Sequence, residues 1–223
     1  MKLKISVLAL VACVMAYGAY AQKGGGYAFK IAKLKYGGGG DWYANPSSLP
    51  NLFRYIRENT KMNIYLEEEV VEPGSALIFQ YPMLYVTGHG NIEFSQAEVE
   101  NLRKYLYAGG FFLMDDNYGL HNYAKREIKK LFPDVPLVEI PFTHPIYHQH
   151  YDFPNGIPKI HEHDGKPAQA FGIFLDGRLA LMLTYETDLG DGWEDAAIHS
   201  NPEEVRQKAF RMGTNIIAYL LTR

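Results

Sequence analysis

One stretch of the chain, from Met83 to Asn117, constrains the fold more than any other part. An apolar run at 83–86 predicts a buried strand, and a second apolar run at 111–114 predicts another. Between them, Ser95 and Glu98 form a capping box that predicts the start of a helix, which ends at the glycine pair 109–110. A strand–helix–strand unit of this length predicts parallel strands joined by a right-handed crossover.

Polar residues follow both predicted strands. Gly88, His89 and Gly90 come after the first strand, and residues 115–117, Asp-Asp-Asn, come after the second. In open parallel sheets, ligands bind beyond the carboxyl ends of the strands. We therefore expect a crevice at this edge of the sheet, with these polar residues beside it.

The rest of the chain alternates between strand and helix patterns. Further strands are expected at residues 27–36, 62–66, 137–140, 169–175 and 179–185, and further helices at 47–59, 118–131 and 202–223. The last two strands flank Asp-Gly-Arg at 176–178, which indicates a hairpin. The glutamates at 67–69 are expected to form a solvated run, and residues 188–193 a polar loop. The pattern predicts an α/β domain with a mainly parallel sheet and a C-terminal hairpin.

The N-terminus has the pattern of a secretory signal. Lys2 and Lys4 precede an apolar run at 5–17, and Ala-Tyr-Ala at 19–21 is typical of a cleavage site. The predicted organisation is a signal peptide at 1–21, a flexible lead at 22–26 and a single domain at 27–223. The chain is expected to be exported to the periplasm or the extracellular space. Residues 10–13 also resemble a bacterial lipobox, which leaves lipid anchoring at Cys13 as an alternative.

Composition excludes several functional classes. The formal net charge is −3, so the chain lacks the basic surface that nucleic-acid binding requires. After the signal peptide, no stretch reaches the ~18 apolar residues of a membrane-spanning helix. Cys13 is the only cysteine, and it lies inside the predicted signal. The exported domain therefore has neither a disulfide nor thiol chemistry.

Asp115 and Asp116 are predicted catalytic or ligand-binding residues. A carboxylate at a strand end can bind a metal ion, accept a hydrogen bond from a sugar hydroxyl, or act as a base. The alternative is that one of them caps the helix predicted to begin near residue 118.

Histidines concentrate in the irregular segment 141–164, which holds five of the eight in the chain. His144 and His148 are four residues apart, so they would share a face of a short helix and act as metal ligands or as acid–base groups. The alternative is that they are surface histidines of a polar loop. His161 and His163 alternate with acidic residues, and we interpret them as part of a solvated loop.

Four glycines at 37–40 precede Asp41, Trp42 and Tyr43, which are expected near the same crevice. Together with Trp193, the aromatic residues of this set could form a wall for a sugar or peptide, or pack on the sheet rim. His89 and Asn117 complete the predicted ligand-binding set. The sequence has neither a G-x-G-x-x-G pattern nor a P-loop lysine, so no nucleotide cofactor is predicted. The absence of a G-x-S-x-G elbow argues against a serine hydrolase.

Several of these motifs occur together in one order. They are Asp41-Trp42-Tyr43 after a glycine loop, the Gly-His-Gly turn at 88–90, the segment 109–116, Thr-His-Pro-Ile at 143–146, and the loop at 188–193. In this order the chain resembles the bacterial domain of unknown function 4159 family over residues 27–222. The resemblance implies a flavodoxin-like, three-layer sandwich similar to class I glutamine amidotransferases. It implies no activity, and the exported domain lacks the cysteine that amidotransferases use.

Three functions are compatible with these observations. The first is an exported module that binds a polar ligand, a glycan or an envelope protein without a cofactor, in a crevice lined by Asp41, Trp42, His89, Asp115, Asp116 and His144. It requires His144 to lie beside Asp116. The second is a hydrolase that uses carboxylate–histidine chemistry or a divalent metal ion. The third is a structural subunit of an envelope complex.

Overall fold

The computed structural model describes residues 28–223, so the predicted signal peptide, the lead and Cys13 lie outside the described residues. The chain forms a seven-stranded sheet with strand order β2-β1-β3-β4-β7-β6-β5. The strands are β1 (Ile31–Leu34), β2 (Glu69–Val71), β3 (Met83–Val86), β4 (Phe111–Met114), β5 (Val138–Glu139), β6 (Gln169–Leu175) and β7 (Arg178–Tyr185). The first five strands in the spatial order run parallel, and β6 and β5 run antiparallel to their neighbours. This confirms the predicted α/β class, and its parallel part has the flavodoxin-like order.

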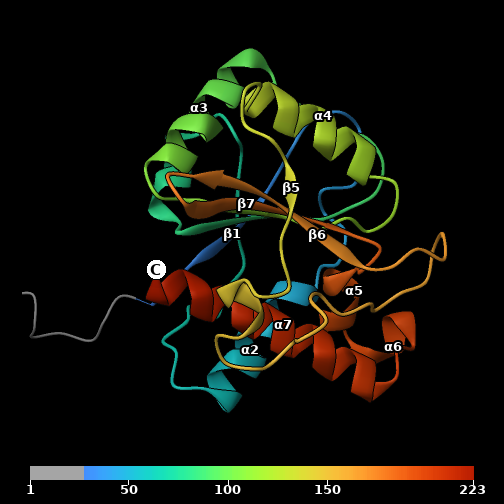
Figure 1. The fold of residues 1–223 in the computed structure, drawn as a ribbon. Helices are drawn as coiled ribbons and strands as arrows, with labels where there is room; N and C mark the ends of the chain where they lie inside the picture. Colours follow the sequence, from blue (N-terminus) through green and yellow to red (C-terminus); the bar gives the residue numbers. More distant parts are fainter. Residues whose placement is uncertain (1–27) are drawn as a thin grey trace, which may run out of the picture.

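Helices cover both faces of the sheet (Figure 1). One face carries α3 (Gln96–Tyr107) and α4 (His121–Leu131), and the other carries α2 (Ser48–Asn59) and α7 (Glu203–Thr222). Shorter elements are η1 (Ala76–Gln80), η2 (Pro145–Tyr147), α5 (Leu189–Trp193) and α6 (Ala196–His199). Among the helices of the described chain, none combines the length and apolarity needed to cross a bilayer.

Successive residues of the central strands point to opposite faces, which creates two apolar cores. Met83 and Tyr85 belong to the core under α2 and α7, whereas Leu84 and Val86 belong to the core under α3 and α4. Because both faces are covered, every residue of β3 and β4 is buried. The continuous apolar runs in the sequence follow from this arrangement.

The predicted strand at 62–66 is wrong. Ile64 makes only an isolated bridge with Phe29. The strand that pairs with the outer edge of β1 is β2, which begins at the last glutamate of the run. Lys33 lies in β1 and pairs with Glu68 at 3.1 Å, while Lys30 pairs with Glu69 at 3.0 Å. These glutamates therefore contact the basic side chains of the neighbouring strand, instead of forming a fully solvated run.

Two other boundaries differ from the prediction. Helix α4 begins at His121, because Tyr118 and Gly119 have positive φ angles of 95° and 85°, which no right-handed helix adopts. Residues 189–193, predicted as a loop, form the short helix α5. Elsewhere the local signals hold: the capping box of Ser95 and Glu98 starts α3 with both of its hydrogen bonds.

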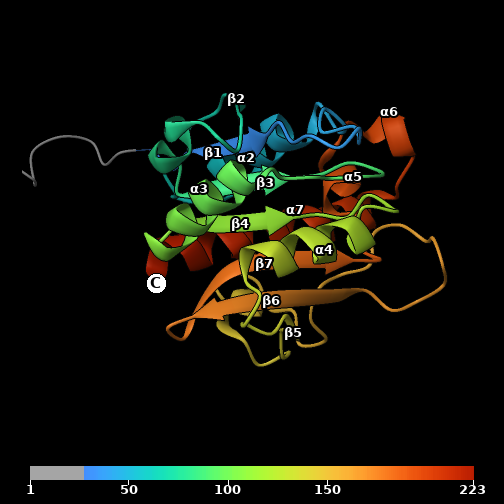
Figure 2. The ribbon, with the colours of Figure 1, turned by 90° about the horizontal axis from the view of Figure 1, so that it is seen from above.

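The carboxyl ends of β1, β3, β4 and β7 meet at one edge of the sheet (Figure 2). Helices α5 and α6 lie at this edge, and the long segment before β6 reaches it from the side of the hairpin. The edge therefore gathers loops from distant parts of the sequence.

Candidate functional site

Three histidines and two aspartates converge at this edge of the sheet. We call them the His–Asp cluster: His161, His163, Asp188, Asp191 and His199. Within it, His161, His163 and Asp188 form one group, and His161, Asp191 and His199 form another; in each group the ligand atoms lie within 4.8 Å of one another. Two atoms that bind one ion at about 2.1 Å lie at most ~4.2 Å apart, so small side-chain rotations bring either group into coordinating range.

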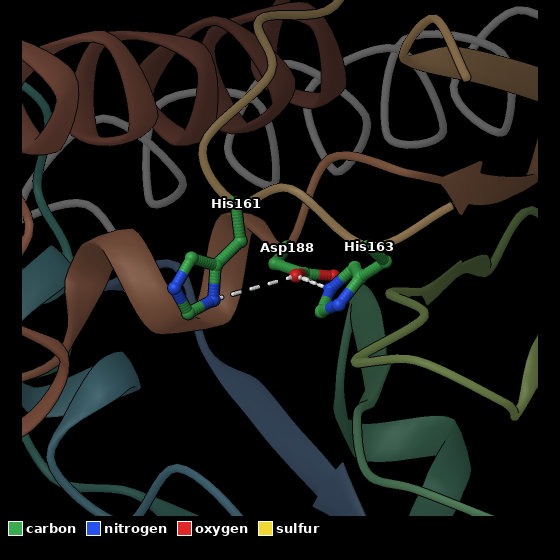
Figure 3. Close-up of side chains that lie close together, drawn as sticks. All are labelled: His161, His163 and Asp188. Carbon is green, nitrogen blue, oxygen red and sulfur yellow. Dashed lines mark hydrogen bonds and ion pairs between the residues drawn. The ribbon is translucent and has the colours of Figure 1, made fainter. Parts of the chain in front are cut away.

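Asp188 lies at the centre of the first group (Figure 3). Its Oδ2 atom is hydrogen-bonded to Nε2 of His163 and lies 3.9 Å from Nδ1 of His161. The two imidazoles approach this carboxylate from the same loop, while Asp188 itself follows β7. Nitrogen and oxygen donors thus converge from both sides of the site.

Asp191 and His199 extend the cluster along α5 and α6. Oδ2 of Asp191 lies 3.1 Å from Nδ1 of His161 and 3.5 Å from Nδ1 of His199. The other ring nitrogen of His199 lies 2.8 Å from Oε2 of Glu194, which is buried. A carboxylate on the far nitrogen orients the ring and fixes its tautomer, as commonly occurs behind metal-binding histidines.

Asp188 is fully buried, and its Oδ1 atom has no hydrogen-bond partner among residues 28–223. Burial, and then the negative charges of Asp115 and Asp191, raise the pKa of Asp188 to about 9. The residue also has a left-handed backbone, with φ of 54°. An unpaired buried carboxylate oxygen and a strained backbone are both costly, and such features concentrate at functional sites.

Asp115 supports the His–Asp cluster through buried hydrogen bonds to β7 and α5. It is fully buried, its Oδ1 accepts from Oγ1 of Thr184 at 2.7 Å, and its Oδ2 accepts from the backbone N–H of Gly190 at 2.7 Å. Burial raises its pKa to about 7, although these hydrogen bonds act in the opposite direction. Because Gly190 is in α5, Asp115 anchors the helix that carries Asp191.

Asn117 supports Asp191 through a second buried residue. Asn45 donates to Oδ1 of Asp191 at 2.8 Å and accepts from the side-chain amide of Asn117 at 2.8 Å. Gly190 lies against this network, since a Cβ atom there would come within 2.6 Å of Asn45 Nδ2 and 2.7 Å of Tyr85 Oη. Asn117, which was predicted to bind a ligand, therefore supports Asp191 through Asn45.

Asp116 stabilises the turn that leads into α4, which is close to the capping role predicted as the alternative for this carboxylate pair, although the N-cap residue itself is Leu120. Its Oδ1 accepts backbone N–H groups of Tyr118, Leu120 and His121 at 3.2, 2.9 and 3.1 Å. Burial raises its pKa, and these hydrogen bonds oppose that shift. Asp116 also lines the cavity beside the cluster, so the capping role does not remove it from the site.

A polar cavity of about 540 Å³ opens beside the His–Asp cluster. His163 belongs both to its wall and to the cluster, and the ring of Tyr118 stacks on His163 with centroids 4.5 Å apart. The remaining wall residues come from the segment before α4 and its first turns, from the segment before β6 and the start of β6, and from the end of β7 and the residue after it. A molecule in this cavity would therefore contact the His–Asp cluster at His163.

Asp41 and His89 form a separate pair at the ends of β1 and β3. Nδ1 of His89 lies 2.9 Å from Oδ2 of Asp41, and the backbone N–H of His89 donates to the same carboxylate. Trp42 packs partly against the core next to this pair, and Tyr43 is exposed. These residues lie outside the wall of the 540 Å³ cavity.

The prediction that Trp193 forms part of an aromatic ligand wall is wrong. Its side chain is fully buried, its Nε1 donates to the backbone oxygen of Ala209 at 2.8 Å, and its ring lies 5.7 Å from that of Tyr85. Trp193 therefore joins α5 to α7 in the core and has no surface for a ligand.

The prediction that His144 lies beside Asp116 is also wrong. His144 packs against Phe174 and Tyr219, near the end of the sheet opposite to the His–Asp cluster. His148 interacts with Asp152 at 2.5 Å and with the backbone oxygen of Phe142 at 2.8 Å. Neither residue belongs to the two groups of potential metal ligands in the described chain.

The sequence-based interpretation placed His161 and His163 in a solvated loop, whereas the structure places both in the candidate site. His199, which also belongs to the site, is absent from the predicted set. His161-x-His163 and Asp188-x-x-Asp191 are both short spacings of metal-binding residue types. Their convergence depends on the hairpin, which brings the segment before β6 next to the segment after β7. Pairing the two motifs across the predicted hairpin was the signal available in the sequence.

His121 predicts a specific pH dependence of stability. Burial, and then the nearby charge of Lys125, lower its pKa from 6.5 to about 4. Between these values the unfolded chain binds a proton that the folded chain does not. The free energy of unfolding therefore falls as the pH drops through this window, by up to ~1.4 kcal/mol per pH unit from this residue.

The variant His121→Phe keeps an aromatic ring between Tyr185 and Phe171 and removes the titration. Urea unfolding of both proteins at pH 4.5, 5.5, 6.5 and 7.5 measures the difference. We expect the stability of the variant relative to the wild type to rise as the pH falls below 6.5. A difference that is independent of pH would contradict this assignment.

Comparison with known protein families agrees with the resemblance seen in the sequence. The family described as Domain of unknown function (DUF4159) matches residues 30–221, which is nearly the whole described chain. No curated protein matches the chain. The similarity in fold to glutamine amidotransferases stays a prediction.

Proposed function

Because the chain belongs to the DUF4159 family, whose description assigns no activity, we propose a function from the site itself: metal-dependent hydrolysis of a polar substrate. The observation that carries the proposal is Asp188, a fully buried carboxylate with an unpaired oxygen, held next to His161 and His163. A cation would pair with that oxygen and offset the repulsion from the neighbouring aspartates.

The donor set favours a transition-metal ion. Imidazole nitrogens suit zinc, iron, copper and nickel, and a mixture of imidazoles and carboxylates is common in zinc and manganese sites. His161, His163 and Asp188 are the proposed ligands, with Asp191 and His199 as the adjacent pair. Glu194 behind His199 and Asn45 behind Asp191 supply the outer contacts that orient such ligands.

The position of the cluster favours hydrolysis over a purely structural ion. A structural zinc site is closed by four protein ligands, whereas a catalytic site keeps a position open to water and substrate. His163 lies at the boundary between the cluster and the 540 Å³ cavity. A bound ion lowers the pKa of a coordinated water molecule toward neutrality and so supplies a nucleophile.

The chemistry required of the protein follows from the same residues. His163 and Asp188 would hold the ion at the cavity wall, and Asp115 and Asp116 fix the segments on either side. No thiol or serine elbow is needed. Export of the chain, which the sequence of residues 1–21 predicts, is part of the proposal and is compatible with a secreted metal-dependent hydrolase.

The proposal is tested with protein purified without a chelator or a histidine tag. Metal content is measured by mass spectrometry, and hydrolysis of ester, amide, glycoside and phosphoester model substrates is measured before chelation, after chelation and after reconstitution with zinc, manganese or cobalt. We expect stoichiometric metal and at least one activity that chelation abolishes and the metal restores.

Two outcomes would contradict the proposal in different ways. A protein that binds none of these ions with micromolar or better affinity would refute the metal site. A protein that binds metal and a polar ligand, with no turnover across the substrate panel, would support the simpler function of an exported binding module, now centred on the His–Asp cluster.

A further inference from the structure

We infer that the cavity beside the His–Asp cluster binds an oxyanion group of the substrate, and that Lys125 and Lys166 recognise it. This inference rests on the proposed function for the reaction, but the binding of the anion can be measured without the metal. Both lysines line the cavity, Lys125 from α4 and Lys166 from the segment that precedes β6.

The two ammonium groups are held at the cavity without a carboxylate partner. Nζ of Lys125 lies 5.0 Å from the ring centroid of Phe171, and Nζ of Lys166 donates to the hydroxyl of Tyr185 at 3.0 Å. In the part of the chain that the structure describes, neither lysine is within ion-pair distance of an acidic group, although most of the other lysines form such pairs. Their charges are therefore available to a ligand.

The acidic residues of the same wall already have partners. Asp116 accepts three backbone N–H groups, and Glu186 accepts from Nζ of Lys159 at 2.9 Å and from the backbone N–H of Asp164 at 3.0 Å. Asp164 in turn accepts from the hydroxyl of Tyr118 at 3.2 Å. Each acidic side chain of this wall therefore has a hydrogen-bond partner, and Glu186 also has a charged one, whereas neither lysine has an acidic partner.

His121 adds a second unsatisfied group to this wall. The residue is buried, it lines the cavity, and its Nδ1 atom has no hydrogen-bond partner within residues 28–223. Its ring centroid lies 4.2 Å from that of Tyr185, whose hydroxyl accepts a hydrogen bond from Lys166. The uncharged ring would accept a hydrogen bond at this nitrogen from an N–H or O–H group of a ligand whose oxyanion the lysines hold.

The arrangement defines a substrate class. The metal at the His–Asp cluster would lie next to the bond that is hydrolysed. The lysines would bind an oxyanion of the same substrate molecule, which is either a phosphate or a carboxylate. Ammonium groups act as point charges on either anion, so the geometry of the two lysines alone suits both. The experiment below distinguishes a phosphate group from a carboxylate group.

Inorganic phosphate and acetate are titrated separately into metal-free wild-type protein and into the double variant Lys125→Gln/Lys166→Gln, with binding followed by calorimetry and NMR. Lys104→Gln on α3 is the matched control, because it removes a lysine distant from the cavity. We expect saturable binding of at least one anion, a loss of about tenfold or more in the double variant, and no change in the control. The anion that binds more tightly identifies the group.

Metal affinity is measured on the same proteins, so that a failure of the anion site can be distinguished from a failure of the metal site. Weaker anion binding with unchanged metal affinity supports the inference. Equal anion binding by the wild type and the double variant, or no binding of either anion, overturns it and leaves the metal proposal intact. Lysine-dependent anion binding in a protein that binds no metal would support the anion site and refute the metal-dependent reaction.

Discussion

Replacing Asp188 with asparagine is expected to weaken metal binding by at least ~100-fold, because loss of an outer-shell partner alone commonly costs 10–100-fold. The substitution keeps the size of the side chain and removes the negative charge that faces His161 and His163. It also removes the buried acidic group whose pKa is raised by burial and then by the charges of Asp115 and Asp191. Metal-free Asp188→Asn should therefore be at least as stable as metal-free wild type, so any loss of metal is not a loss of fold.

Competition with a chromophoric chelator measures the affinity, and thermal unfolding in excess chelator measures the stability. His148→Gln is the matched control, because it removes a histidine that the sequence favoured and that the structure places against Phe142 and Asp152. Its metal affinity should equal that of the wild type. If both variants lost metal equally, or Asp188→Asn retained it fully, the His–Asp cluster would not be the metal site.

Replacing Trp193 with alanine is expected to lower the free energy of unfolding by ~3–5 kcal/mol, the usual cost of truncating a large buried aromatic side chain. Trp193 is fully buried, contacts the ring of Tyr85 and donates to Ala209 in α7. The cavity left behind would lie directly beneath α5. The expected result follows from a core position and would not follow from a ligand-binding position at the surface.

Urea unfolding monitored by circular dichroism measures this effect without relying on tryptophan fluorescence. Trp42→Ala is the companion variant, since Trp42 is only partly buried at the other end of the same edge. We expect a clearly smaller loss of stability for it. Equal losses in the two variants, or a loss below about 1 kcal/mol for Trp193→Ala, would show that α5 does not depend on this packing.

The fold could be predicted because its signals are local. The two apolar runs around α3, the capping box of Ser95 and Glu98, and the hairpin at 176–178 each act within a few residues. The prediction of a strand at 62–66 is wrong because contacts with β1 determine which segment pairs with it. The segment that pairs is the one whose glutamates form ion pairs with Lys30 and Lys33. That choice depends on contacts across the sheet, which periodicity does not contain.

The candidate site could be predicted only in part, for the same physical reason. The carboxyl edge of the sheet follows from topology, and Asp115 and Asp116 do lie there. His163 and Asp188 are 25 residues apart and meet only once β6 and β7 have paired. His144 carries the same chemistry, but the chain leaves it near Phe174, at the opposite end of that hairpin. Residue type suggested chemistry based on histidine and carboxylate groups, and the pairing of β6 with β7 determines which histidines lie beside the aspartates.

The five residues of the His–Asp cluster all lie between positions 161 and 199, on either side of the β6–β7 hairpin. An ion held by both sides would act as a cross-link that closes this one loop of the chain. Ligand binding stabilises a folded state by ~4 kcal/mol when the free ligand is a thousandfold above its dissociation constant. With the export proposed above, and with a single cysteine in the chain, the resistance of this segment to proteolysis would then follow the supply of metal outside the cell.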